Sequence, residues 1–298
     1  MNIGIFGVGS FGEKHIKVIQ DINQFNIIGF YDPDKKKSTE ISNKYQLTSF
    51  ESPIELINHC NAIDVVSNTS SHYKIIEKCI ELNKNIFIEK PICSSQTELN
   101  NIINKTQNYQ PIIQVGHIER YNPAIKDGFS HFNNIQSISS KRTGSLNKRN
   151  QNTSITLDLM IHDIDLVISN VKSKIININA LGKNKINNLC NHVTCEIIFE
   201  NGIVAKLTAV RDNNMENERK FTINLPEQKI EIDLLHKEKN HIYNDKIKTH
   251  IYKKNTNLLE LEFLEFYNCI KNNKQPIVGP NEACAAVNIA LEIDKLIN

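Results

Sequence analysis

The chain has 298 residues, of which 40% are hydrophobic and 23% charged, and its formal net charge at pH 7 is +2. This composition is typical of a globular protein, and the length favours two domains. A nearly neutral chain gives no electrostatic reason to expect a nucleic acid or a membrane as partner. Seven cysteines without a CxxC pair indicate reduced thiols and hence a cytoplasmic protein. We expect neither a signal peptide nor a membrane span, because the chain opens on a short apolar run and holds none of membrane-spanning length.

A glycine motif, GVGSFG at residues 7–12, follows the first apolar run and precedes apolar residues at helical spacing. Set between a strand and a helix, GxGxxG is the fingerprint of a dinucleotide-binding fold. Its first glycine permits a sharp turn, its second lets a pyrophosphate approach the backbone, and its third lets the helix pack close to the sheet. The N–H groups of the helix N-terminus would face the phosphates. The residues assigned to the cofactor here are Gly7, Gly9, Ser10, Phe11 and Gly12; a turn without a ligand is the alternative.

Asp32 supplies the second half of this fingerprint, because it ends the next apolar run, at 26–31, and lies 20 positions after Gly12. A carboxylate at this place accepts hydrogen bonds from the ribose hydroxyls of an adenosine and repels a 2′-phosphate. Asp32 therefore predicts NAD as the cofactor and disfavours NADP. The lysines at 35–37 could weaken this preference, since they would attract a 2′-phosphate.

Strands and helices alternate up to about residue 118. Apolar runs predict strands at 2–6, 26–31, 63–67, 85–89 and 111–116, separated by helical patterns at 11–22, 34–45, 70–83 and 94–107. This alternation predicts an α/β fold, with a Rossmann-type doubly wound parallel sheet over residues 1–118. Ligands of such sheets bind beyond the carboxyl ends of the strands. The site candidates at those ends are Asn68, Thr69, Glu89, Lys90, Gly116 and His117.

The pattern changes after residue 118. A helix at 122–132, a strand at 135–142, a basic loop at 144–152 and a helix at 155–169 precede strand-like runs at 174–182, 192–200, 203–211, 219–225, 228–235 and 247–253. Consecutive strands without helices between them predict an open, mostly antiparallel sheet, and hence a second, α+β domain over residues 119–298. Asn201-Gly202 predicts a hairpin turn within it. Helices at 257–272 and 281–297 are expected to close the chain.

Lys90 follows the predicted strand 85–89 and precedes Pro91, which stops the strand and keeps the lysine out of a helix. An ammonium group held there beside a nicotinamide can hydrogen-bond a substrate hydroxyl and lower its pKa. A solvated lysine in a connection is the alternative. The position at the carboxyl end of a strand favours the catalytic interpretation.

Three polar residues, Asp158, His162 and Asp165, recur at helical spacing within the largely apolar segment 156–166. On a helix they share one narrow stripe, and burying such groups is costly unless they are paired or used. A carboxylate one turn before a histidine can orient the ring and support its protonated form, as a general base requires. The alternatives are a satisfied structural network and a metal site, although the sequence offers no evident third ligand for zinc.

Taken in order along the whole chain, these motifs resemble the Gfo/Idh/MocA oxidoreductases. The resemblance rests on the glycine motif 7–12, Asp32-Pro33, Glu89-Lys90-Pro91 and the Asp158-x-x-x-His162 helix. It implies that Lys90, Asp158 and His162 surround a sugar next to the nicotinamide and are the catalytic residues, with no metal. The further cofactor contacts that it implies are Asn68, Thr69, His72, Glu89 and Lys90.

Segments 116–123, 142–144 and 158–165 more narrowly resemble the branch of this family that oxidises the 3-hydroxyl of UDP-N-acetylglucosamine for envelope sugars such as lipid A. This implies an NAD-dependent dehydrogenase of a UDP-sugar, an aminotransferase acting next, and a homodimer or homotetramer. An inositol or free-sugar dehydrogenase and a dinucleotide-binding sensor without turnover are the alternatives. The residues expected to bind the substrate are Arg120, Tyr121, Arg142, Arg149 and Asp165, with Arg142 and Arg149 contacting the diphosphate.

Overall fold

The computed structural model describes residues 1–126, 128–129, 132, 134–146, 151–244, 246–253 and 256–297. The chain forms two compact units. The first comprises Met1–Ile118 and Asn257–Cys284, and the second comprises Glu119–Thr256 and Ala285–Asn298. The sequence prediction placed all of 119–298 in the second domain, so it differs from the structure in the segment Asn257–Cys284.

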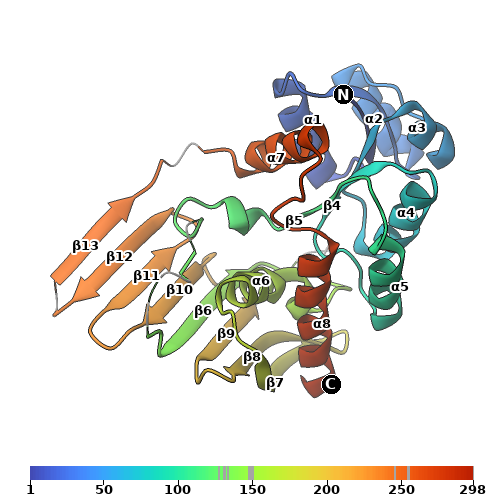
Figure 1. The fold of residues 1–298 in the computed structure, drawn as a ribbon. Coiled ribbons are helices and arrows are strands. Elements are labelled where there is room, and N and C mark those ends of the chain that lie inside the picture. The colour runs from blue at the N-terminus through green and yellow to red at the C-terminus, as the bar shows by residue number, and fades with distance from the viewer. Residues whose placement is uncertain are drawn as a thin grey trace. The chain divides into compact units, whose positions relative to one another are not determined.

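A five-stranded parallel sheet with the order β2-β1-β3-β4-β5 forms the centre of the first unit (Figure 1). Its strands are short apolar runs because helices cover both faces of the sheet. The prediction of a Rossmann-type fold is therefore confirmed. The strands are β1 (Asn2–Phe6), β2 (Asn26–Tyr31), β3 (Ala62–Val65), β4 (Asn85–Glu89) and β5 (Ile113–Gly116). The helices between them are α1 (Ser10–Asp21), α2 (Lys35–Tyr45), α3 (Pro53–His59), α4 (Thr69–Glu81) and α5 (Gln96–Thr106).

Helix α7 (Leu258–Asn272) belongs to the first unit because its aromatic side chains join that unit's core. Phe263 stacks on Phe87 of β4 with the ring centroids 4.5 Å apart, and Phe266 stacks on Phe25 at 6.2 Å. The helix packs beside α1 (Figure 1). Fully burying a phenylalanine side chain contributes about 1.5–3 kcal/mol. The burial of these rings therefore explains why the segment belongs to the first unit, although its position in the sequence predicted the second domain.

An eight-stranded sheet with the order β13-β12-β11-β10-β6-β9-β8-β7 forms the second unit. All neighbouring strands are antiparallel except β6 and β9, which confirms the mostly antiparallel sheet. Gly202, at φ +86°, lies in the predicted hairpin between β8 and β9. The strands are β6 (Ser137–Gly144), β7 (Ile175–Ile186), β8 (Leu189–Phe199), β9 (Val204–Arg211), β10 (Arg219–Asn224), β11 (Lys229–Asp233), β12 (Glu238–Tyr243) and β13 (Lys246–Ile251).

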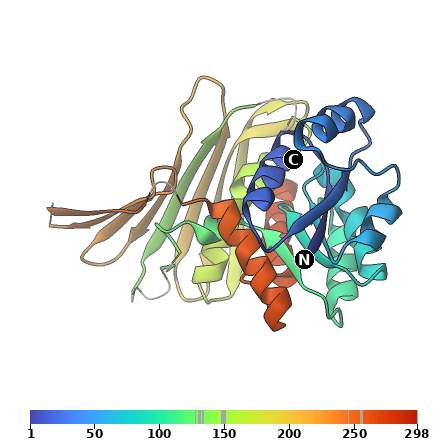
Figure 2. The same ribbon diagram turned by 90° about the horizontal axis from the view of Figure 1, so that it is seen from above.

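Helices α6 (Ile161–Asn170) and α8 (Pro280–Ile297) lie on one face of this sheet, against its β6–β9–β8–β7 half (Figures 1 and 2). Two segments differ from the prediction. The expected helix at 155–169 begins as a π-helical turn, η2 (Thr156–Met160), and only then becomes α6. In the expected helix at 122–132, the described residues after the short 3₁₀ helix η1 (Ile118–Tyr121) form turns instead. There the Asn122 side chain accepts from the Ala124 N–H at 3.1 Å, which favours a turn over a helix.

No helix in the described part of the chain is long and apolar enough to cross a membrane.

Candidate active site

The glycine motif forms a tight connection between β1 and α1. Gly7 has φ +93°, and a Cβ atom there would lie 2.6 Å from Ser67 Cα. A Cβ on Gly12 would collide with Gly7 O, whereas one on Gly9 would meet no protein atom within 4 Å. Gly9 is also the N-cap of α1 and contributes no side-chain hydrogen bond to the helix end. The N–H groups beyond it, beginning with Ser10 and Phe11, therefore adjoin open space of the kind that a pyrophosphate requires.

Asp32 follows β2 and is held by two backbone hydrogen bonds. Its Oδ2 accepts from the Val8 N–H at 2.8 Å and its Oδ1 from the Asp34 N–H at 2.9 Å. Each oxygen keeps a lone pair with which it can accept from a ribose hydroxyl. Two of the three lysines that follow are paired with carboxylates: Lys35 with Glu51, and Lys37 with Glu40 at 3.0 Å. These ion pairs reduce the attraction of the lysines for a 2′-phosphate, so the geometry favours NAD.

The start of α4 lies after β3, and its N-cap, Asn68, makes no side-chain capping bond. Asn68 and Thr69 thus keep their polar groups at the carboxyl end of the sheet, as expected of cofactor contacts. His72 differs from the prediction. It is 1% exposed, and its Nδ1 and Nε2 lie 2.8 Å from Pro91 O and 3.1 Å from Ser67 O. Burial lowers the pKa of His72 against the opposing effect of these carbonyls. Its imidazole therefore ties two loops together instead of reaching the cofactor.

Glu89, at the end of β4, belongs to a buried ionic group that the sequence did not indicate. His15 Nδ1 lies 3.0 Å from Asp64 Oδ2, and His15 Nε2 lies 3.4 Å from Glu89 Oε1. Burial opposes the charged form of His15, but Asp64 and Glu89 raise its pKa to about 10. Burial likewise opposes the ionised form of Glu89, but His15 and Lys90 bring its pKa below the ordinary value. The Glu89 side chain thus serves an internal ion pair, and the residue that follows it, Lys90, is half-buried at the carboxyl end of β4.

In the second unit, three aspartates on the segment from η2 to α6 are each paired with an arginine from a different element. The pairs are Arg211–Asp158 at 2.9 Å, Arg142–Asp163 at 2.6 Å and Arg120–Asp165 at 2.6 Å. The arginines come from β9, β6 and η1. His162 lies among these pairs and is half-buried, with its Nδ1 buried. The segment therefore carries a titratable imidazole in a fixed frame of matched charges.

Arg142 corrects the sequence interpretation, which assigned it to a substrate diphosphate. Its side chain is 2% exposed and donates to Asp163 Oδ1 at 2.6 and 2.9 Å and to Glu119 Oε1 at 3.1 Å. Burial opposes its charge, but the two carboxylates raise its pKa above the ordinary value. Buried charges of this kind are retained only with such partners. Arg142 is therefore part of the core and cannot contact a ligand.

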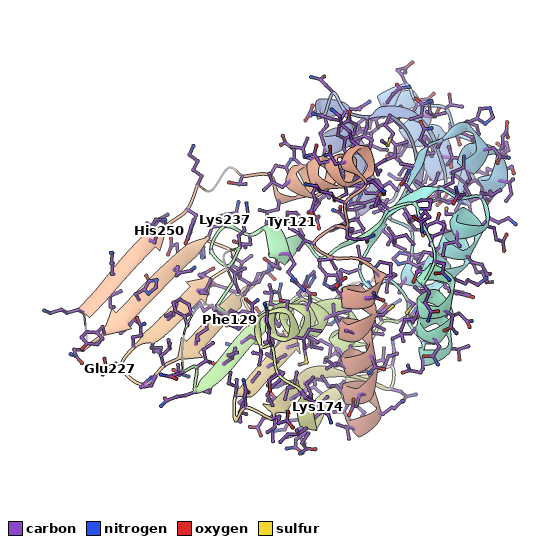
Figure 3. All side chains as sticks on the ribbon, viewed as in Figure 1. Tyr121, Phe129, Lys174, Glu227, Lys237 and His250 are labelled. Carbon is purple, nitrogen blue, oxygen red and sulfur yellow. The ribbon has the colours of Figure 1, made fainter. Side chains whose placement is uncertain are left out.

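Asp165 is likewise not available to a substrate. It is 1% exposed, and both of its oxygens accept from Arg120, at 2.6 and 2.9 Å. This bidentate pair fixes η1 to α6 and engages the Arg120 guanidinium as well. Tyr121, at the end of η1, is 6% exposed (Figure 3). Arg149, the remaining predicted substrate ligand, lies outside the described residues.

Arg211 is the functional candidate that the sequence did not reveal. It is the last residue of β9, and its Nη2 donates to Asp158 Oδ2 at 2.9 Å. The two residues are 53 positions apart. A single arginine at a strand end carries no local signal, because its importance depends on which carboxylate the fold brings to it.

Each unit by itself carries groups of the kinds that a dehydrogenase of alcohols uses. The first fits a dinucleotide through its glycine connection and Asp32, and it carries Lys90 at a strand's carboxyl end. The second carries Asp158 and His162. Among the described residues, no group of three His, Cys, Asp or Glu side chains could hold a metal ion.

Comparisons with known proteins agree with this chemistry. Residues 1–117 match the Gfo/Idh/MocA model of an oxidoreductase family with an NAD-binding Rossmann fold. The chain is 26% identical over 212 residues to the UDP-N-acetylglucosamine 3-dehydrogenase of Acidithiobacillus ferrooxidans, covering 71% of this chain and 67% of that one. It is 25% identical over 178 residues to the myo-inositol 2-dehydrogenase of Thermotoga maritima, covering 56% of this chain and about half, 53%, of that one.

The same fold occurs in solved structures across the whole chain. The A. ferrooxidans UDP-N-acetylglucosamine 3-dehydrogenase aligns with a TM-score of 0.91 at 23% identity, covering 100% of this chain and 97% of that one. A levoglucosan dehydrogenase in complex with NADH and L-sorbose aligns with a TM-score of 0.88 at 15% identity, covering 99% and 96%. Residues 1–117 are therefore an NAD-binding Rossmann domain of the Gfo/Idh/MocA oxidoreductase family. The chain is an NAD(P)-dependent oxidoreductase of CH–OH groups and shares the fold of the dehydrogenases named above.

Proposed function

We propose that this enzyme oxidises the 3-hydroxyl of UDP-N-acetylglucosamine to the 3-keto sugar, with NAD as the oxidant. The observation that carries the proposal is the half-buried His162, four residues after the Arg211-held Asp158, in the second unit. The similarity to the A. ferrooxidans enzyme supports the choice of sugar, because it extends over 212 residues and thus beyond the 117 of the cofactor domain. The inositol dehydrogenases support the alternative, oxidation of an inositol or a free sugar.

His162 is assigned as the general base. Because its Nδ1 is buried, we assign Nε2 as the atom that takes the proton of the sugar hydroxyl. Bound NAD would supply the acceptor for the hydride of the same carbon, so that one C–H and one O–H bond would break and the C–O bond would become C=O. Lys90 donates a hydrogen bond to the hydroxyl oxygen and stabilises its developing negative charge. Asp158 stabilises the imidazolium that results.

The first unit is assigned the binding of NAD. The N–H groups at the start of α1 hold the pyrophosphate, and Asp32 accepts from the adenosine ribose. Asn68 and Thr69, at the carboxyl end of β3, are further contacts. The burial of His72 and Glu89 assigns them to the support of these loops. Lys90 would then lie next to the nicotinamide, as the strand order places the end of β4 beside the end of β3.

The diphosphate of the substrate needs cationic partners other than Arg142. Arg120 is held by Asp165, and Lys141 pairs with Glu218 at 2.6 Å. Arg149 remains the sequence-based candidate for this role. The proposal also includes an aminotransferase that consumes the 3-keto sugar, and a homodimer or homotetramer assembled through the open sheet.

Replacing His162 by alanine tests the assignment. Since general-base catalysis contributes about 10²–10⁴ in rate, we expect kcat to fall by that factor while the Kd for NAD is unchanged. The assay is NADH absorbance with a panel of UDP-sugars, free hexoses and inositols, with an aminotransferase present to remove the ketone. Turnover of inositol or a free hexose, but not of UDP-N-acetylglucosamine, would contradict the proposed substrate. Near-normal turnover of the His162→Ala variant would contradict the role of the histidine and favour Lys90 as the base.

A further inference from the structure

Arg211 contacts the start of the candidate catalytic helix at three points. Its Nη1 donates to Thr153 O at 2.8 Å, and its Nη2 donates to Ser154 O at 3.3 Å and to Asp158 Oδ2 at 2.9 Å. The Arg211 side chain is 1% exposed, whereas that of Asp158 is 23% exposed. A buried guanidinium therefore holds a partly exposed carboxylate together with the backbone that precedes it.

The segment that Arg211 fixes is the π-helical turn η2, Thr156–Met160. π-helical turns are rare and are frequently found at functional sites. The turn already has its own backbone support, since the Asp158 N–H donates to Ser154 O at 3.0 Å. What Arg211 adds is a fixed place and a balancing charge for the Asp158 carboxylate, one turn before His162.

We propose that Arg211 is a positioning residue for the reaction: it fixes Asp158 and balances its charge, and so controls the protonation of His162. This inference rests on the proposed function, in which His162 is the general base. Arg211 does not itself touch the substrate, because its side chain is buried. A purely stabilising role is a weaker explanation, since a buried ion pair is often no more stabilising than apolar residues of similar size.

Among the described residues, the other acidic groups on this segment and the lysines of the strands packed against it are paired. On its own segment, Asp163 pairs with Arg142 of β6, and Asp165 pairs with Arg120 of η1. The remaining lysines of the strands packed against this segment pair elsewhere: Lys141 of β6 with Glu218, and Lys206 of β9 with Glu196. Asp294 of α8 accepts from Thr156; burial raises its pKa, and Arg211 opposes this increase. Removing Arg211 therefore takes one cation away from the Asp158 carboxylate and, to a lesser degree, from Asp294.

Less positive charge beside a carboxylate one turn away favours the protonated imidazole. Opposite charges within a few ångströms typically shift a pKa by about 1–3 units, and partial exposure of Asp158 places the effect at the lower end. In Arg211→Gln we thus expect the pKa of His162 to rise by about one unit. The base would then be protonated over a wider pH range and less well oriented. We expect kcat to fall about 10- to 100-fold, as for the loss of a hydrogen bond between charged groups.

The experiment measures His162 by NMR in histidine-labelled protein, assigned with a His162→Gln variant. Wild type, Arg211→Gln, Asp158→Asn and the double variant are titrated without substrate, and kcat/KM is measured against pH on the best alcohol substrate. We expect the pKa of His162 to rise in Arg211→Gln. It should not change further when Arg211→Gln is added to Asp158→Asn. Lys206→Gln is the matched control, because it removes a positive charge from the same strand at a side chain that is 58% exposed. It should leave the His162 titration unchanged.

An unchanged His162 titration and pH profile in a folded Arg211→Gln variant would overturn the inference, as would an equal shift in Lys206→Gln. If Arg211→Gln does not fold, Arg211→Lys serves instead, because it keeps the charge and loses the planar fork. In Arg211→Lys the pKa of His162 should stay near that of wild type while kcat falls. A kcat equal to that of wild type in this variant would contradict the positioning role. Lack of turnover by the wild type would refute the proposed function, whereas the NMR titration tests Arg211 in either case.

Discussion

Replacing Arg142 by alanine should lower the melting temperature of the second unit. It should have no direct effect on substrate binding. The guanidinium is 2% exposed and serves two buried carboxylates, Asp163 and Glu119. Glu119 retains Arg219 at 3.1 Å, so the main loss falls on Asp163. Removing one partner of a buried ion pair typically costs 3–5 kcal/mol, so we expect the free energy of unfolding to fall by about 4 kcal/mol. For a unit of this size the midpoint of thermal unfolding should fall by about 8–16 °C.

The loss should also depend on pH in a defined direction. Burial raises the pKa of Asp163, and Arg142 opposes this increase. Without Arg142 the pKa of Asp163 rises further above its unfolded-state value. At neutral pH the buried, ionised carboxylate of Asp163 therefore destabilises the folded variant. Protonation of Asp163 at low pH removes this destabilisation. The difference in the free energy of unfolding between variant and wild type should therefore become smaller as the pH falls.

Circular dichroism melting is the appropriate assay, since the chain contains no tryptophan. Lys141→Ala is the control, because the neighbouring lysine is 47% exposed and its pair with Glu218 lies at the surface. Its effect should stay within about 1 kcal/mol. The reasoning would be refuted if Arg142→Ala melted like Lys141→Ala while the KM for UDP-sugars rose strongly. That result would restore the diphosphate role which the sequence alone indicated.

Three further outcomes follow from the cofactor unit. Asp32→Ser should reduce the NAD-over-NADP ratio of kcat/KM by about 10- to 100-fold. The reason is that the variant loses both the hydrogen bonds from the ribose to a charged group and the repulsion of a 2′-phosphate. An unchanged ratio would argue against Asp32 as the ribose ligand. Gly9→Ala should keep the melting temperature, because a Cβ there meets no protein atom within 4 Å, yet weaken NAD binding measured by calorimetry; unaltered affinity would mean that the pyrophosphate lies elsewhere. The pKa of His15 is raised to about 10 by Asp64 and Glu89 against the effect of burial, so its protonated form stabilises the fold below pH 6.5 and this stabilisation is lost as the pH rises toward 10. The melting temperature of wild type should accordingly fall more steeply over that range than that of His15→Asn, and parallel curves would contradict the ionic group.

The cofactor unit was predictable because its signals are local. Its strands are apolar runs, and β2 and β4 are followed directly by the polar candidates Asp32 and Lys90, so both could be placed from the order of residues alone. The short helix α3 was missed, although Ser52 and Pro53 are ordinary signals for a helix start. The segment from 257 to 284 was assigned to the wrong unit, because only packing reveals that Phe263 belongs against β4.

The candidate site in the second unit was predictable only in part. Asp158 and His162 stand out because they lie four residues apart between the apolar residues of that segment. Their surroundings depend on pairs that lie far apart along the chain: Arg120 and Asp165 are 45 positions apart, and Arg211 and Asp158 are 53 positions apart. The sequence shows arginines near a site, but whether they face a ligand or a buried carboxylate is decided by the fold. That is why Arg142 was misassigned and Arg211 was overlooked.

The central claim, oxidation at C3 of UDP-N-acetylglucosamine with NAD, can be tested with a deuterium label. The substrate is prepared with deuterium at C3 and, as a control, at C4 of the same sugar. The account predicts that deuterium from C3 appears in the reduced nicotinamide, that none is transferred from C4, and that His162→Ala slows this transfer by about 10²–10⁴. Transfer from another carbon, or deuterium transfer only from labelled inositol or free hexose, would contradict it.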